Sequence, residues 1–177
     1  MAGSGLYTDT PRGVQAITAA LARSDHCTMH ISIVSEGDLA ALLPLMRAYC
    51  DFYRADPSDD ALLAMSRALI ADPHREGVQF IARAGEGAAI AFATVFWSWE
   101  TTGGGRIGVM NDLYVSPAWR GRNVGERLIA ACRSACHEHG ALGLSWQTAP
   151  DNHRAQALYE RVGARSARWV DYWLDAR

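Results

Sequence analysis

The stretch that decides the fold is Asn111–Leu128, NDLYVSPAWRGRNVGERL. It begins with the end of an apolar strand, passes through a loop of small and cationic residues, and continues into a helix predicted from about Val124 to His139. The start of such a helix has unpaired backbone N–H groups and the positive end of the helix dipole. Small residues let an anion approach that backbone, and Arg120 and Arg122 add positive charge. The stretch therefore predicts an anion-binding cradle.

Strands and helices flank this stretch on both sides. The periodicity predicts strands over residues 30–35, 78–83, 89–99, 106–115, 142–146 and 168–174. It predicts helices over residues 38–53, from 58 to about 70, 124–139 and 152–161. Strands mixed with helices in this way indicate a single α/β (α+β) domain.

The composition excludes several classes of protein. The 177 residues carry a net charge of −2, so no basic field attracts nucleic acid. Four cysteines do not make a disulfide framework, and no apolar run approaches the ~18 residues of a membrane span. The first residues lack the features of a signal peptide. We expect a cytoplasmic protein without membrane or nucleic-acid partners, with an N-terminal extension over 1–28 and one domain over 29–177.

Two motifs resemble those of the GNAT N-acyltransferase family. Arg120–Gly125 resembles the signature Arg/Gln-x-x-Gly-x-Gly/Ala, with Asn123 in place of the middle glycine. Some thirty residues later, Asn152, Ala155 and Leu158-Tyr159 stand in the order of a second family motif. More narrowly, the patterns at 49–53, 112–115 and 146–148 resemble the subgroup of the yeast histone and polyamine acetyltransferases. The resemblance covers residue 29 to the C-terminus. It implies a mixed, mostly antiparallel twisted sheet of six to seven strands flanked by about four helices.

The resemblance also implies acetyl-CoA as the co-substrate and a set of residues that hold it. These are Leu113, Tyr114 and Val115 on the strand, Arg120, Gly121, Arg122, Asn123, Val124, Gly125 and Glu126 on the loop and helix start, and Asn152 and Tyr159. Tyr159 matches the family's general acid, which protonates the departing thiolate. A phenol of pKa near 10 is protonated at neutral pH and is a competent donor.

Two positions depart from the family pattern. Asn123 tolerates left-handed backbone angles, and Asn123-x-x-Glu126 resembles a helix capping box. Asn111 stands where the polyamine enzymes carry a glutamate and cannot act as a base. The adjacent Asp112 is a candidate base, but strand alternation points it to the other face unless a bulge re-aims it. A water chain or a residue of the first helix is the alternative proton acceptor.

The acceptor amine is expected beside Tyr49, Phe52 and Tyr53, at the end of the first helix, and beside Asn111. No metal is expected. Cys132, Cys136 and His139 share one helical face, but that face is the apolar stripe, so small thiols packed against the sheet explain it better than zinc.

Tryptophan pairs at 97/99 and 169/173 each share a strand face. They indicate core or a subunit interface, with an acceptor pocket as the alternative, and a homodimer is expected. The resulting hypothesis is an acetyl-CoA-dependent N-acetyltransferase acting on a primary amine of a small molecule or protein side chain through a direct ternary complex. A non-catalytic acyl-CoA-binding module and an acyltransferase using another acyl group remain open alternatives.

Overall fold

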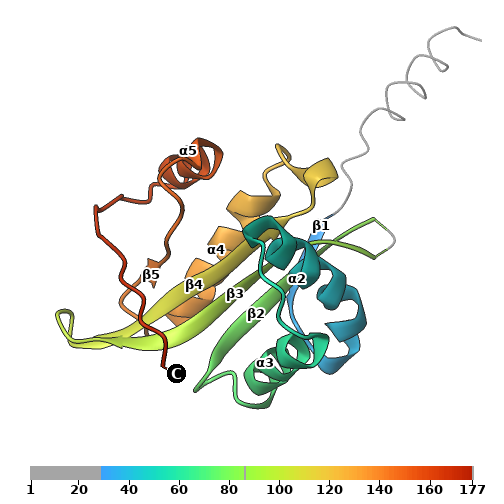
Figure 1. Ribbon diagram of the computed structural model, residues 1–177, viewed down its shortest axis with the longest axis horizontal. Helices are drawn as coiled ribbons and strands as arrows, with labels where there is room; N and C mark the ends of the chain where they lie inside the picture. Colours follow the sequence, from blue (N-terminus) through green and yellow to red (C-terminus); the bar gives the residue numbers. More distant parts are fainter. Residues whose placement is uncertain (1–28, 86, 177) are drawn as a thin grey trace, which may run out of the picture.

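The computed structural model describes residues 29–85 and 87–176, in which a mixed sheet has helices on both faces (Figure 1). The expected extension 1–28 lies outside the described residues. The elements in chain order are β1 (Met29–Ile33), a 3-10 turn η1 (Glu36–Asp38), α2 (Leu39–Tyr53), α3 (Asp59–Ala71), β2 (Gly77–Ala84), β3 (Ala88–Glu100), β4 (Gly105–Val115), a 3-10 turn η2 (Pro117–Trp119), α4 (Val124–Glu138), β5 (Leu144–Ser145) and α5 (His153–Arg161). The predicted α/β class and four α-helices are confirmed for this part of the chain.

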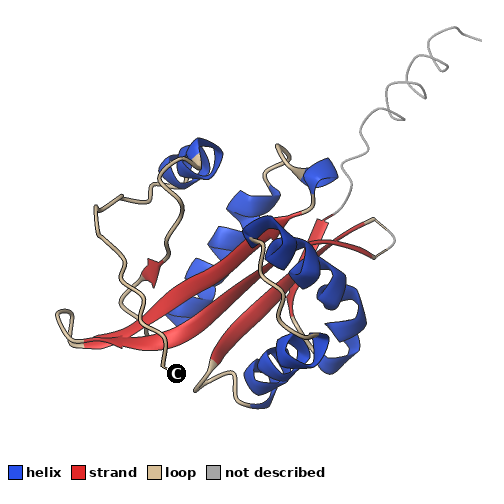
Figure 2. Cartoon of the chain, in the orientation of Figure 1, coloured by secondary structure: helices blue, strands red, loops and turns tan. Residues whose placement is uncertain are grey.

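The sheet of the described chain has five strands in the order β1-β2-β3-β4-β5, so the expected six to seven strands are wrong (Figure 2). β1 to β4 pair antiparallel, and β5 pairs parallel to β4 only at Gly108 and Val109. The predicted strand over 168–174 is not formed. Because β5 pairs over only two residues, it offers no edge on which a further strand could be built.

The sheet is covered on both faces, which explains the nearly continuous apolar sequence of β2 and β3. On one face α4 places Leu128, Cys132 and Cys136 in a buried layer against the sheet. On the other face α2 and α3 cover a second buried layer that includes Leu42 and Phe92. The interpretation of the two thiols as core is confirmed, and burial raises the pKa of Cys132 to about 12.

His139, the third residue of that face, lies at the C-terminal end of α4, where it stacks on Trp97 with ring centroids 4.0 Å apart. No group of three His, Cys, Asp or Glu residues that could hold a metal is found in the described residues. No helix within residues 29–176 is long and apolar enough to cross a bilayer.

Of the two tryptophan pairs, only Trp97 packs against the core. Trp99 is 71% exposed beside Arg106, whose guanidinium lies 4.9 Å from the ring centroid. Trp169 and Trp173 are 85% and 90% exposed on the unpaired C-terminal segment. The core interpretation is therefore wrong for these three side chains.

A β-bulge changes the direction of β4. Thr94 of β3 pairs with Asp112, but the next residue, Val95, pairs with Met110, so Asn111 is an extra residue without a partner. Met110 packs in the layer under α4, whereas Tyr114 packs in the layer under α2. Without the bulge, regular alternation would place both side chains on the same face.

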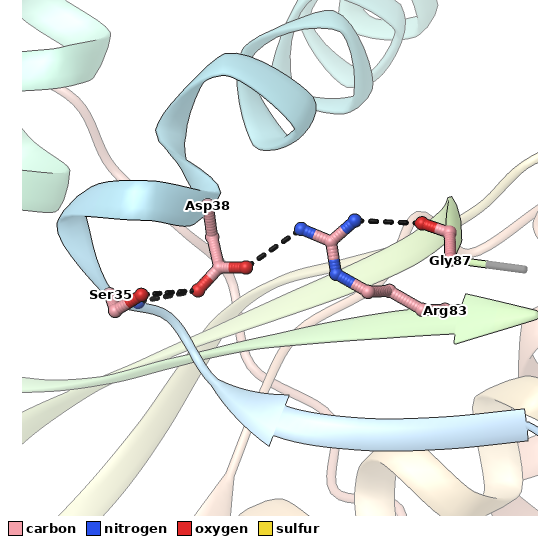
Figure 3. Close-up of polar contacts among 4 residues, drawn as sticks. All are labelled: Ser35, Asp38, Arg83 and Gly87. Carbon is pink, nitrogen blue, oxygen red and sulfur yellow. Dashed lines mark hydrogen bonds and ion pairs between the residues drawn. The ribbon is translucent and has the colours of Figure 1, made fainter.

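An ion-paired cluster fixes the start of the first helical segment (Figure 3). The backbone N–H and hydroxyl of Ser35 donate to Asp38 at 2.9 and 2.6 Å, which forms a capping box. Arg83 of β2 donates to the other oxygen of Asp38 at 2.7 Å and to the carbonyl oxygen of Gly87 at 2.8 Å. Hydrogen bonds from Ser35 and then from Arg83 lower the pKa of Asp38 to about 2.

Candidate functional site

A cavity of about 580 Å³ lies at the C-terminal end of β4. It is bounded by the end of α2, the loop between β4 and α4, the start of α4, the segment after β5, and α5. Its described lining includes eleven of the twelve residues expected to hold the co-substrate and all four expected to face the acceptor. These are Leu113, Tyr114, Val115, Arg120, Gly121, Asn123, Val124, Gly125, Glu126, Asn152 and Tyr159, and Tyr49, Phe52, Tyr53 and Asn111.

Two residues with positive φ shape the loop before α4. Gly121 has φ 77°, and Asn123 has φ 60° and ψ 13°. The left-handed conformation predicted for Asn123 is confirmed. The predicted capping box is wrong, because the Asn123 side chain makes no capping hydrogen bond and Glu126 forms an ion pair with Arg161 at 2.9 Å. The first backbone N–H groups of α4 therefore have no side-chain cap from Asn123, and their residues, Val124, Gly125 and Glu126, line the cavity.

The two loop arginines play different parts. Arg120 lines the cavity, and its Nε donates to the carbonyl oxygen of Val115 at 2.9 Å, which ties the loop to the end of β4. Arg122 lies over the ring of Trp119 at 5.0 Å from the centroid and does not line the cavity. The cation–π contact holds its charge beside the indole, outside the described lining of the cavity.

Gly125 leaves room for the Leu158 side chain of α5 beside the start of α4. A Cβ at this position would lie 3.0 Å from Cδ2 of Leu158, tighter than ordinary contact. On α5, the side-chain oxygen of Asn152 accepts a hydrogen bond from the N–H of Ala155 at 3.2 Å and caps the helix. The glycine and the cap together fix the position of Tyr159 two turns further along α5.

Tyr159 is half-buried with its ring against Trp146, the centroids being 5.2 Å apart. Burial, and then the nearby Tyr53, raise the pKa of Tyr159, while a hydrogen bond with Thr148 lowers it by less. The net direction is upward from 10, so the phenol holds its proton at neutral pH. It therefore has a proton to donate to a group that develops negative charge in the cavity.

Three aromatic rings at the end of α2 form the opposite wall. The rings of Tyr49 and Tyr53, and of Phe52 and Tyr53, meet edge to face with centroids 5.0 Å apart. The hydroxyl of Tyr49 donates to the main-chain carbonyl of Asn111 at 3.2 Å. The wall is therefore attached directly to the bulge of β4.

Asp112 lies behind this wall, 7% exposed and outside the cavity lining. The bulge places it on the α2 face, in register with Thr94 and Gln79 of the neighbouring strands. Gln79 donates to the Thr94 hydroxyl at 3.0 Å, and Asn111 donates to the Asp112 carboxylate at 3.0 Å. Burial raises the pKa of Asp112, and hydrogen bonds from Thr94, Asn111 and Tyr49 offset part of the rise. The carboxyl is therefore a stronger base than an exposed aspartate.

Several lining residues were not expected from the sequence. Trp119 and Trp146 line the cavity, as do Arg154, Leu158 and Arg161 of α5. The α5 residues stand at positions i, i+4 and i+7, the spacing of one helix face. The spacing shows that these three side chains share a face, but the sequence alone does not show which face of α5 meets the loop.

Comparisons with known proteins agree with this geometry. The profile of the "Acetyltransferase (GNAT) family" matches residues 39–164. The "Uncharacterized N-acetyltransferase YhfO" of Bacillus subtilis (strain 168) is 32% identical over 148 residues, which cover 83% of this chain and 97% of that protein. The "Aminoglycoside N(6')-acetyltransferase type 1" of Stenotrophomonas maltophilia is 29% identical over 119 residues, covering 66% and 76%. The structure of aminoglycoside N-acetyltransferase AAC(6')-Iy in complex with CoA superposes with a TM-score of 0.72 at 23% identity, covering 85% of this chain and 96% of that one. This last likeness shows the fold.

Proposed function

The chain belongs to the GNAT acetyltransferase family, and on that premise we propose that it transfers the acetyl group of acetyl-CoA to a primary amine of a small molecule or protein side chain. One observation carries the proposal: a single cavity joins an uncapped helix N-terminus, a protonated phenol and an aromatic wall. The first feature suits a pyrophosphate, the second a departing thiolate, and the third an organic amine.

We assign the cofactor contacts as follows. The N–H groups at the start of α4 and the loop from Arg120 to Gly125, without the Arg122 side chain, hold the pyrophosphate. The backbone of Leu113–Val115 pairs with the pantetheine arm, because β5 pairs with β4 only at Gly108 and Val109 and leaves this edge free. The amide nitrogen of Asn152 remains available to the same arm, since only the oxygen caps α5.

The chemistry follows from holding both reactants in one cavity, which lowers the barrier by several kcal/mol. The neutral amine attacks the thioester carbonyl, so that the N–C bond forms and the C–S bond breaks. A backbone N–H of β4 stabilises the oxyanion, and Tyr159 gives its proton to the thiolate. Asp112 accepts the ammonium proton through the hydroxyl of Tyr49 or a water. The transfer is direct, with no covalent enzyme intermediate.

Three further proposals concern the protein as a whole. We place it in the cytoplasm and, within the family, nearest to the yeast histone and polyamine acetyltransferases. We also propose a homodimer, supported by the exposed apolar side chains of the C-terminal segment, Trp169, Val170, Tyr172, Trp173 and Leu174. Light scattering on the wild type and on Trp173→Asp tests the dimer, which the variant is expected to weaken.

The proposed function is tested in two steps. Acetyl-CoA at ~100 times its dissociation constant should stabilise the fold by about 2.7 kcal/mol, measured as a thermal shift. Release of free thiol from acetyl-CoA in the presence of primary amines should then show turnover. A thermal shift without thiol release from any amine would favour the non-catalytic binding module. Release from a longer acyl-CoA alone would favour the other acyltransferase alternative.

Tyr159→Phe tests the role of the phenol. The variant keeps the ring that packs against Trp146 but has no proton to donate. Turnover should fall ~10²-fold while acetyl-CoA affinity stays the same. Tyr172→Phe is the matched control, because Tyr172 is 92% exposed on the C-terminal segment. Unchanged turnover in Tyr159→Phe would assign the proton donor to water or to another group.

A further inference from the structure

The charged residues of the cavity are unevenly distributed. All four charged side chains in its described lining come from the loop before α4, from α4 or from α5: Arg120, Glu126, Arg154 and Arg161. The lining contributed by α2, by β4 and by residues 146–148 carries no charge. The end of the cavity where the acceptor enters is therefore uncharged and largely aromatic.

The charge balance of the lining disfavours a polycation. Glu126 is the one carboxylate among the described lining residues, and it is already paired with Arg161. Arg120 and Arg154 are cations, so the described lining offers no unpaired carboxylate to a polycation. A second or third ammonium group on the acceptor would lie in the cavity without a carboxylate partner, and an unpaired charge removed from water is costly.

The structure provides one carboxylate for one amine. Asp112 lies directly behind the aromatic wall and is in hydrogen-bond contact with Asn111, whose main-chain carbonyl accepts from Tyr49. Its burial prevents it from serving as a surface attractor for further cations. A single ammonium that loses its proton to this carboxylate matches the site.

The wall itself presents an unused apolar surface. Phe52 and Tyr53 are 62% and 53% exposed, although each buries one edge against its neighbour. Trp146 and Tyr159 stand on the other side of the cavity as a second edge-to-face pair. A flat ring that enters this cavity meets aromatic side chains of both groups, and aromatic contacts are favourable beyond the area they bury.

We propose that the acceptor is a primary monoamine with a flat aromatic body and no second positive charge, held between the wall of Tyr49, Phe52 and Tyr53 and the Trp146–Tyr159 pair. This proposal rests on the proposed function, because it names the acceptor of that reaction. It separates the protein from enzymes that acetylate polyamines or other polycations.

Binding to the CoA-loaded protein tests the proposal without requiring turnover. Calorimetry would compare 2-phenylethylamine with n-propylamine, which lacks the ring, and with spermidine, which adds charges. The aromatic amine should bind at least about tenfold more tightly than either. Spermidine binding as tightly as 2-phenylethylamine, or no detectable binding of 2-phenylethylamine, would overturn the proposal.

Two variants test which side chain is responsible for the tighter binding of the aromatic amine. Phe52→Ala should weaken 2-phenylethylamine roughly tenfold and leave n-propylamine unchanged, because only the ring uses that surface. Trp99→Ala, at the far end of the β3–β4 hairpin, removes an exposed aromatic ring outside the cavity and should change neither amine (Figure 1). Equal losses for both amines in Phe52→Ala would contradict the stacking argument.

Thiol release measured with the same amines distinguishes a failure of the acceptor inference from a failure of the proposed function. Transfer to spermidine in preference to 2-phenylethylamine would overturn this inference and keep the proposed function. Preferred binding of 2-phenylethylamine with no transfer to any amine would overturn the proposed function and keep the assignment of the aromatic site.

Discussion

Asn123 is the position where the structure makes the sharpest prediction about this loop. Its backbone is left-handed at φ 60°, and its side chain makes no capping hydrogen bond. A left-handed conformation costs an ordinary L residue about 1–2 kcal/mol, and asparagine and glycine less. Substitution therefore changes the backbone energy at this position and little else.

The expected changes in the free energy of unfolding follow from this backbone energy. Asn123→Gly relieves the left-handed strain, but it loosens the unfolded chain by about 0.5–1 kcal/mol, so the net change should stay within about 0.5 kcal/mol. Asn123→Ala should lose about 1 kcal/mol, and Asn123→Val more, because a β-branched side chain resists positive φ. For a domain of this size, 1 kcal/mol shifts Tm by about 2–4 °C.

Thermal denaturation of the three variants, followed by acetyl-CoA titration, provides the measurement. Asn123→Gly should bind acetyl-CoA as well as the wild type, because glycine leaves every N–H of the α4 start free. A Tm loss in Asn123→Gly as large as in Asn123→Val would refute the backbone explanation. Normal stability with a large loss of affinity in Asn123→Gly would show that the amide itself contacts the cofactor.

Three other perturbations have defined outcomes. The lowered pKa of Asp38 stabilises the fold above its usual value of 3.8, and this contribution is lost as the pH falls toward about 2. Asp38→Asn should therefore cost about 1 kcal/mol at pH 7 after solvent screening, and denaturation curves of variant and wild type should converge in acid. The effect of pH on stability is the opposite for Asp112. Because its pKa is raised, the buried carboxylate destabilises the fold as the pH rises through that pKa. Asp112→Asn should raise Tm near pH 8 but not near pH 3 and should lower turnover, and an equal Tm difference at both pH values would argue against a buried charge. Gly108→Ala should lose about 1–3 kcal/mol, because its Cβ would meet Cys136, Val95 and Trp97. Adding Cys136→Ala to Gly108→Ala should restore part of that stability. If urea denaturation shows no recovery in the double variant, the contact with Cys136 is not the source of the strain.

Local patterns predicted most of the elements. Ser58 before α3 and the glycines after α4 and α5 mark helix ends that the structure places within two residues of the prediction. The apolar runs of β2, β3 and β4 were equally clear, because strands covered on both faces are long and nearly continuous.

The failures concern partners that lie far apart in the sequence. The alternation over 168–174 is that of a strand, but a strand needs an edge, and the two-residue β5 supplies none. Glu126 stands at capping-box spacing from Asn123, yet Arg161, 35 residues away, takes its carboxylate.

The single extra residue in β4 changes the face of the sheet to which the following side chains point. Up to Met110 the strand contributes to the layer under α4, and after Asn111 the same alternation is shifted by one, so Asp112 and Tyr114 join the layer under α2. The residues on either side of the bulge therefore contribute to opposite faces of the sheet, and Asp112 reaches the α2 face because of the extra residue. The count of residues between Gly105 and Asp112 is consequently more constrained than their identity. Deleting one residue there would return Asp112 to the α4 side, whereas exchanging one apolar residue for another would leave its direction intact.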